Sequence, residues 1–140
     1  MKVFLDTNVW LSATVFAGLC EDVVLQCAER GWLVSSPLIR AEAHEVLRRK
    51  FALQPKACDL FDAVWNGAAL IEDQNEPEDD NDERLIRAAV KARVDVFVTG
   101  DKRVLSWALK PPNRLSLGDL VIATPREAWT LLFGDSAKRD

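Results

Sequence analysis

Two aspartates stand where apolar runs end, and parallel sheets present ligand-binding groups at such positions. Asp6 closes the run KVFLD (2–6), and Asp101 comes two residues after the run DVFVT (95–99). In open α/β sheets, ligands bind beyond the carboxyl ends of the strands. Each aspartate also has an ordinary alternative, since Asp6 could cap a helix that begins near Asn8 and Asp101 could be a turn residue. The pair therefore indicates either a shared site or two local caps.

Two more acids lie along helix faces that are otherwise apolar. Glu42 follows Leu38 by four residues and precedes Val46 by four, so the three share one face of a predicted helix. Asp82 precedes Leu85 by three residues, at the head of an apolar stripe. A buried carboxylate is costly unless a cation, a metal ion or a shifted pKa compensates for it. The alternative for Glu42 is a place at the solvent-exposed edge of its helix.

If these four carboxylates converge, they need a compensating cation, because carboxylates at close range do not all stay ionised on their own. Oxygen ligands favour Mg²⁺ or Mn²⁺, whereas zinc usually recruits cysteine or histidine. The single histidine, His44, is two residues from Glu42 and points to another side of the helix. An EF-hand counted from Asp79 fails, because Arg84 stands where the turn glycine belongs. The residue types thus predict a magnesium or manganese site.

Negative charge is concentrated in one segment. Residues 72–83 hold eight acids and no bases, whereas the other 128 residues carry 18 basic and 14 acidic side chains, a net charge of +4. Asp79 and Asp80 precede the predicted helix, where carboxylates cap and favour its positive end. Asp80 or Asp79 could also serve the metal beside Asp82 or instead of it.

Short apolar runs alternate with helical patterns along the chain, which is typical of a parallel sheet covered by crossover helices. Gly and Pro signals place the helix ends, as in Ser36-Pro37 and Thr124-Pro125. We predict a single α/β domain over 1–134 and a frayed tail over 135–140. The predicted strands are 2–6, 32–36, 69–72, 95–99 and 119–124, and the predicted helices are 21–30, 37–51, 55–67, 82–93 and 125–134.

The three cysteines show no CxxC spacing and form no disulfide framework, which indicates a reducing compartment. No apolar run approaches the roughly 18 residues that a bilayer span needs, and the N-terminus shows no signal peptide. We therefore expect a cytoplasmic protein without a membrane segment.

Five stretches, taken in order, are similar to one known family: FLDTNVWLSA, SSPLIRAEAHEVLRRKF, EDDNDERLIRAAV, DVFVTGDKRVL and IATPREAWTLL. The chain resembles the PIN domain family of metal-dependent nucleases, and more narrowly its VapC-like toxin branch. The resemblance implies a three-layer α/β/α fold with a mainly parallel five-stranded sheet in the order 3-2-1-4-5. It implies that Asp6, Glu42, Asp82 and Asp101 form the acidic metal site, with Asn8 and Thr99 as supporting polar residues.

The activity implied by the resemblance is that of an endoribonuclease, which hydrolyses RNA phosphodiester bonds with Mg²⁺ or Mn²⁺. Toxin-like relatives commonly dimerise and are inhibited by a small antitoxin, so a homodimer and a cognate antitoxin are expected. Basic residues near the acids are candidates for RNA contact, since phosphate binding uses Lys and Arg. These candidates are Lys102, Arg103 and Arg40, followed by the run 48–50.

Two other functions are compatible with parts of the pattern. A haloacid-dehalogenase-like phosphatase also places an aspartate after its first strand, but it usually has a second one two positions later, where this chain has Asn8. A non-catalytic PIN-like module would bind RNA or protein without cleaving it. Such modules usually lack some of the acids, and all four are present here.

Overall fold

A five-stranded parallel sheet forms the centre of the molecule. The computed structural model describes residues 1–134, so the predicted tail 135–140 lies outside the described residues. The strand order is β3-β2-β1-β4-β5 and every pairing is parallel, which confirms the predicted topology. The strands are β1 (Val3–Leu5), β2 (Leu33–Ser35), β3 (Ala69–Leu70), β4 (Val96–Val98) and β5 (Val121–Ala123).

The central strands β1 and β4 are apolar throughout because both of their faces are covered. Every residue of Val3–Leu5 and Val96–Val98 is buried, as expected for strands inside a parallel sheet. Phe4 pairs with Phe97 across the two strands, and their rings stack with centroids 5.3 Å apart. By contrast β3, at the edge, is exposed and shorter than the predicted strand 69–72. The best-buried pair of strands is thus the pair that Asp6 and Asp101 follow in the sequence.

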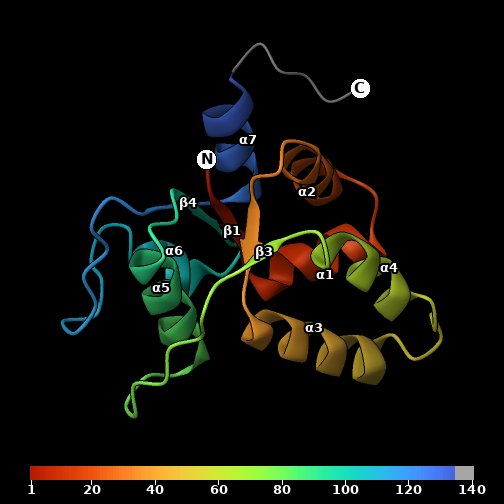
Figure 1. Cartoon of the computed structure of the whole chain (residues 1–140), viewed down its shortest axis with the longest axis horizontal. Helices are drawn as coiled ribbons and strands as arrows, with labels where there is room; N and C mark the ends of the chain where they lie inside the picture. The colour runs from red at the N-terminus through yellow and green to blue at the C-terminus, as the bar shows by residue number, and fades with distance from the viewer. Residues whose placement is uncertain (135–140) are drawn as a thin grey trace.

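Helices cover both faces of the sheet and complete the three layers. Figure 1 shows α1, α3 and α4 on one side of the strands and α5 and α6 on the other. The helices are α1 (Thr7–Val15), α2 (Leu19–Glu29), α3 (Pro37–Lys50), α4 (Ala57–Trp65), α5 (Asn81–Lys91), α6 (Lys102–Ser106) and α7 (Pro125–Phe133).

The ends of the helices differ from the predicted ones by a residue or two. α2 begins at Leu19, directly after Gly18, and not at residue 21. α4 begins at Ala57, because the residues after Pro55 form a turn first. The short helix α6, which follows Asp101, was not predicted. Ser36 holds the predicted cap position of α3, but its side chain makes no capping hydrogen bond.

Within residues 1–134, no single helix is both long and apolar enough to cross a membrane. Helices α1 and α2 reach the required length only as a pair, and this pair is bent by 104°.

Candidate active site

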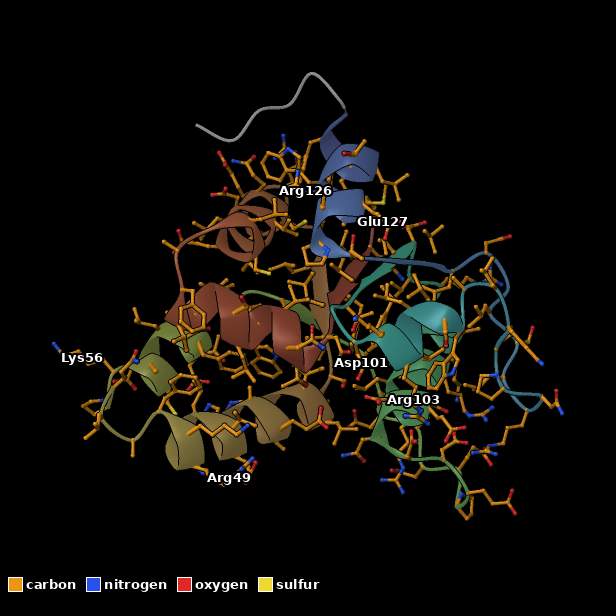
Figure 2. The ribbon with its side chains drawn as sticks, turned by 180° about the vertical axis from the view of Figure 1, so that it is seen from behind. Arg49, Lys56, Asp101, Arg103, Arg126 and Glu127 are labelled. Carbon is orange, nitrogen blue, oxygen red and sulfur yellow. The ribbon has the colours of Figure 1, made fainter. Side chains whose placement is uncertain are left out.

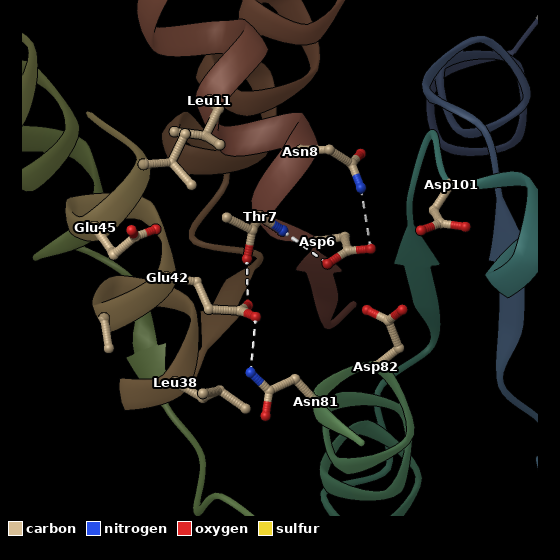
Figure 3. Close-up of a pocket in the computed structure, with 12 residues that line it drawn as sticks. Asp6, Thr7, Asn8, Leu11, Leu38, Glu42, Glu45, Asn81, Asp82 and Asp101 are labelled. Atoms are coloured by element: carbon tan, nitrogen blue, oxygen red, sulfur yellow. Dashed lines mark hydrogen bonds between the residues drawn. The ribbon is translucent and has the colours of Figure 1, made fainter. Parts of the chain in front are cut away.

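An open cavity of about 590 Å³ lies beyond the carboxyl ends of β1 and β4. We call it the carboxylate cavity, and Figure 3 shows the side chains around it. Elements far apart in the sequence contribute to it, since residues from the starts of α1, α3 and α5 meet residues from the strand ends. The lining residues are Asp6, Thr7, Asn8, Leu11, Leu38, Ala41, Glu42, Glu45, Val46, Asn81, Asp82 and Asp101. The four predicted acids therefore share one cavity.

Asp6 is the most buried of the four acids, with 4% of its surface exposed. It caps α1, since its carboxylate accepts a hydrogen bond from the Thr7 amide at 2.8 Å. It also accepts from the Thr99 hydroxyl at 2.7 Å and from the Asn8 amide group at 3.1 Å. Burial raises the pKa of Asp6, the bonds from Thr99 and Thr7 oppose that rise, and nearby Glu42 and Asp101 add to it. Asp6 is thus both a helix cap and a member of the acidic cluster.

Asn8 and Thr99 join the ends of β1 and β4. Asn8 accepts a hydrogen bond from the Gly100 amide at 2.8 Å and donates one to the Thr99 hydroxyl at 3.3 Å. The Thr99 hydroxyl oxygen also accepts from the Asp101 amide at 3.0 Å. Both predicted supporting residues therefore lie in the network that holds Asp6 and Asp101.

Asp101 caps the short helix α6. One of its oxygens, Oδ1, accepts from the amides of Arg103 and Val104 at 2.8 and 3.3 Å. The carboxylate still lines the carboxylate cavity, opposite Asp82 (Figure 3). The alternative role predicted for Asp101, a local turn or cap, thus coexists with a place in the cluster.

Asp82 lies in the first turn of α5 and faces Asp6 and Asp101 (Figure 3). Burial, together with repulsion from Asp6, Asp101 and Asp80, raises the pKa of Asp82 to about 6, and Arg103 opposes this rise. Asp80 has a different place, because it caps α5 in a capping box with Glu83 and does not line the cavity. Of the acids at 79, 80 and 82, only Asp82 reaches the carboxylate cavity.

Glu42 links three helices at the middle of the cavity. Its two oxygens accept hydrogen bonds from the Thr7 hydroxyl at 2.7 Å and from the Asn81 amide group at 3.1 Å (Figure 3). These bonds connect α3 to the first residues of α1 and α5. Thr7 and Asn81 were not predicted from the sequence. The signal that could have identified them is their place in the sequence: Thr7 directly follows Asp6 in DTN (6–8), and Asn81 directly precedes Asp82 in DND (80–82).

The candidate RNA-binding residues lie outside the cavity lining. The Arg103 guanidinium pairs with Asp80 at 2.6 Å and Asp82 at 3.1 Å, and it lies 4.9 Å above the Trp107 ring. Arg40 pairs with Asp62 instead. No lysine or arginine in the described part of the chain lines the cavity. Lys102 is therefore outside the lining as well. Figure 2 shows Arg103 beside Asp101. Of these candidates, Arg103 has a contact with a cavity acid.

A family comparison identifies this arrangement of fold and acids. The family model described as PIN domain matches residues 2–103, most of the chain and all four acids. The chain belongs to the PIN domain family. PIN domains are generally nucleases, and they typically use divalent metal ions.

One solved structure shares the PIN fold with this chain over most of both molecules. The crystal structure of PAE2754 from Pyrobaculum aerophilum superposes with a TM-score of 0.62 at 15% identity, over 88% of this chain and 83% of that one. At this identity the likeness concerns the fold alone. A comparison with curated protein sequences finds no significant match.

The residues of this PIN domain fit a hard divalent cation by their chemistry. The polar lining consists of oxygen donors and amide groups, and its carboxylates repel one another in a partly buried place. Among residues 1–134, however, no three His, Cys, Asp or Glu side chains lie close enough together to hold an ion. Asp82 and Asp101 would therefore have to approach the Asp6 carboxylate to share one.

Proposed function

We propose that this PIN domain is an endoribonuclease that depends on Mg²⁺ or Mn²⁺ and hydrolyses phosphodiester bonds in RNA. The observation that carries the proposal is the meeting of Asp6, Glu42, Asp82 and Asp101, from four separate elements, in one open cavity. Membership of a family of nucleases supports the reaction class. The Asp6 carboxylate is held by three hydrogen bonds and the Thr7 hydroxyl is bonded to Glu42, so we propose water, activated by the ion, as the nucleophile.

Asp6, Asp82 and Asp101 would hold the metal ion. Glu42 would be either a further ligand or a residue that positions Thr7 and Asn81. When bound, the ion offsets the charge of the carboxylates and of the scissile phosphate and activates water. Thr99, Asn8 and the Thr7 amide fix the Asp6 carboxylate before any ligand arrives. Glu42 holds the starts of α1 and α5 beside the cavity. The chain itself thus supplies a fixed Asp6 carboxylate and leaves the positive charge to the ion.

The toxin role is part of the same proposal. In this proposal a small cognate antitoxin protein binds the nuclease and holds it inactive. The support for this step is the likeness of the DTN, VTGD and terminal motifs to VapC-like toxins. A homodimer is proposed on the same ground.

The test is cleavage of a panel of single-stranded and structured RNAs in Mg²⁺, Mn²⁺ or EDTA. Wild-type protein should cut only with metal. Asp6→Asn and Asp101→Asn should each lower the rate by at least about 100-fold, since even second-shell partners of metal sites are worth roughly 10–100-fold. Asp119→Asn, a change at an exposed aspartate outside the cavity, is the matched control and should cut normally.

Circular dichroism must show that each variant is folded. Full activity in folded Asp6→Asn protein would overturn the site assignment. Metal binding without cleavage of any RNA in the panel would point to a very narrow substrate, whereas a folded protein that binds no metal would favour the non-catalytic module.

A further inference from the structure

The carboxylate cavity has an apolar end that the metal chemistry does not use. Leu11 of α1 and Leu38, Ala41 and Val46 of α3 line it together with the acids. Leu11, Leu38 and Val46 are only partly buried, although each also packs on the core or lies beside it. Figure 3 shows Leu11 and Leu38 on either side of Glu42. An apolar wall thus continues directly from the acidic end.

Charge decides which part of a nucleotide this wall suits. Glu42 and Glu45 lie among the apolar residues, and the lining includes no basic side chain among the described residues. Glu45 already pairs with Arg49 at 2.9 Å, whereas the hydrogen bonds to Glu42 come from the uncharged side chains of Thr7 and Asn81. A phosphate at this end would therefore meet the negative charge of Glu42 without a compensating cation. A neutral group would avoid that repulsion and would remove water from the leucine and valine surfaces.

The size and the side-chain types of the cavity restrict that neutral group further. A volume of about 590 Å³ lies within the roughly 300–1,000 Å³ of pockets that enclose small molecules. This volume, which includes the acidic end, is large enough for one nucleotide. In the described chain no aromatic ring lines it, so it offers aliphatic contact to one base and not a stacking platform for several.

We propose that the wall formed by Leu11, Leu38, Ala41 and Val46 is a subsite for one unpaired nucleobase next to the scissile phosphate. The inference rests on the proposed function, because it assumes that RNA is the ligand of the acidic end. The wall holds the base while the acidic end, with its ion, holds the backbone. Base pairing would withdraw the base from the wall, so duplex RNA binds poorly.

Binding is measured by fluorescence anisotropy in Ca²⁺, with gels to confirm that the RNA stays intact. The probes are a labelled 12-nucleotide RNA of mixed sequence, single-stranded or annealed to its complement, and an abasic ribose-phosphate chain of equal length. Both single strands carry the same phosphates, so their difference isolates the bases. Wild-type protein should bind the base-bearing strand about tenfold more tightly than the abasic one, as expected for burial of part of one base.

Variants assign that difference to the wall. Leu38→Asn and Val46→Thr keep side-chain size and add polarity, and each should reduce the ratio toward one without changing abasic binding. Leu38→Met, which stays apolar, should keep the ratio. Leu53→Asn, at a leucine that is 99% exposed, is the matched control. If Leu38→Asn fails to fold, Val46→Thr still decides.

The outcomes separate the subsite from the nuclease. Equal affinity of wild-type protein for both strands, or binding of neither, overturns the subsite, even if the protein cuts RNA in Mg²⁺. A base-dependent ratio that disappears in Val46→Thr supports the subsite, even if no RNA is cut, and in that case the proposed function fails alone.

Discussion

Two groups of acids from nearly the same stretch of chain have opposite surroundings. Asp79, whose side chain is fully buried, pairs with Arg87 at 2.7 Å and with Arg114 at 3.1 Å. The hydrogen bond from Arg87 lowers the pKa of Asp79 against the effect of burial, and Arg114 lowers it further. Glu83 pairs with Arg114 as well. The chain thus provides its own cations for Asp79 and Glu83. We call these ion pairs with Arg87 and Arg114 the structural clamp.

Asp82, three residues after Asp79, faces other acids. Its pKa rises to about 6 through burial and through repulsion from Asp6 and Asp101, with Arg103 as its one ion-pair partner in the described chain. The contrast shows that local density of acids in the sequence does not distinguish structure from function. An acid that the fold pairs with arginine stabilises the fold, whereas an acid that the fold leaves beside other acids is prepared for an external cation.

The largest expected effect comes from neutralising the clamp. Asp79→Asn should lower the free energy of unfolding by about 2 kcal/mol, less than the roughly 3–5 of fully buried pairs because both arginines reach solvent. Urea unfolding at pH 7 in EDTA measures it. Because the folded-state pKa of Asp79 is lowered, its contribution is present above pH 3.8 and is lost as the pH falls through the folded-state value. No loss of stability at pH 7 would contradict the clamp.

The isosteric substitution of Asp82, three residues after Asp79, should change the free energy of unfolding in the opposite direction. Asp82→Asn removes a repelled carboxylate and should raise the free energy of unfolding at pH 7 in EDTA by about 1 kcal/mol, after a discount for solvent screening. The same unfolding assay tests it, with Asp79→Asn as its pair. If Asp82→Asn destabilises the protein as Asp79→Asn does, the two acids do not differ in their effect on stability.

The pH dependence of the wild-type protein gives an independent check of that sign. A raised carboxyl pKa means that the folded state keeps a proton that the unfolded chain has released between pH 3.8 and about 6. In EDTA, the contribution of Asp82 to stability should therefore decrease as the pH rises through that window. Asp82→Asn should flatten this decrease, which would be seen in unfolding curves at pH 4.5, 5.5 and 7.

A smaller effect is expected at Arg103, which connects the two groups through its pairs with Asp80 and Asp82. Its guanidinium competes with an added cation for the Asp82 carboxylate. Arg103→Ala should therefore tighten Mg²⁺ binding by about threefold, the scale of an exposed ion pair. Titration calorimetry measures the affinity, and Lys102→Ala on the same helix is the control. Weaker binding in Arg103→Ala would show that Arg103 supports the site and does not compete.

The fold was predictable because its signals are local and repeated. The central strands Val3–Leu5 and Val96–Val98 are short runs of large apolar residues, and Thr124-Pro125 begins α7 as predicted, with a capping box. The face argument also separated Asp82 from its neighbours, since only a residue on the apolar side of α5 points toward the sheet. The cavity acids therefore follow from periodicity together with the strand order that the family resemblance implies.

The partners of those acids were not predictable, because they depend on side-chain direction and on loops. The bonds from Thr7 and Asn81 to Glu42 cross between elements 35 and 39 residues apart. The pairing of Arg114 with Asp79 depends on the loop before β5, which has no periodic pattern. Arg40 shows the same limit, since its proximity to Glu42 in sequence did not reveal that it turns toward Asp62.

The bond between Asp6 and Thr99 joins residues 93 positions apart. The cavity cannot form early during synthesis, because β1 at residues 3–5 pairs with β4 only after residues 96–98 have been made. A nascent or truncated chain that stops before Asp101 carries the DTN motif and no complete acidic cluster. The topology of the sheet thus delays the complete acidic cluster until Asp101 has been made.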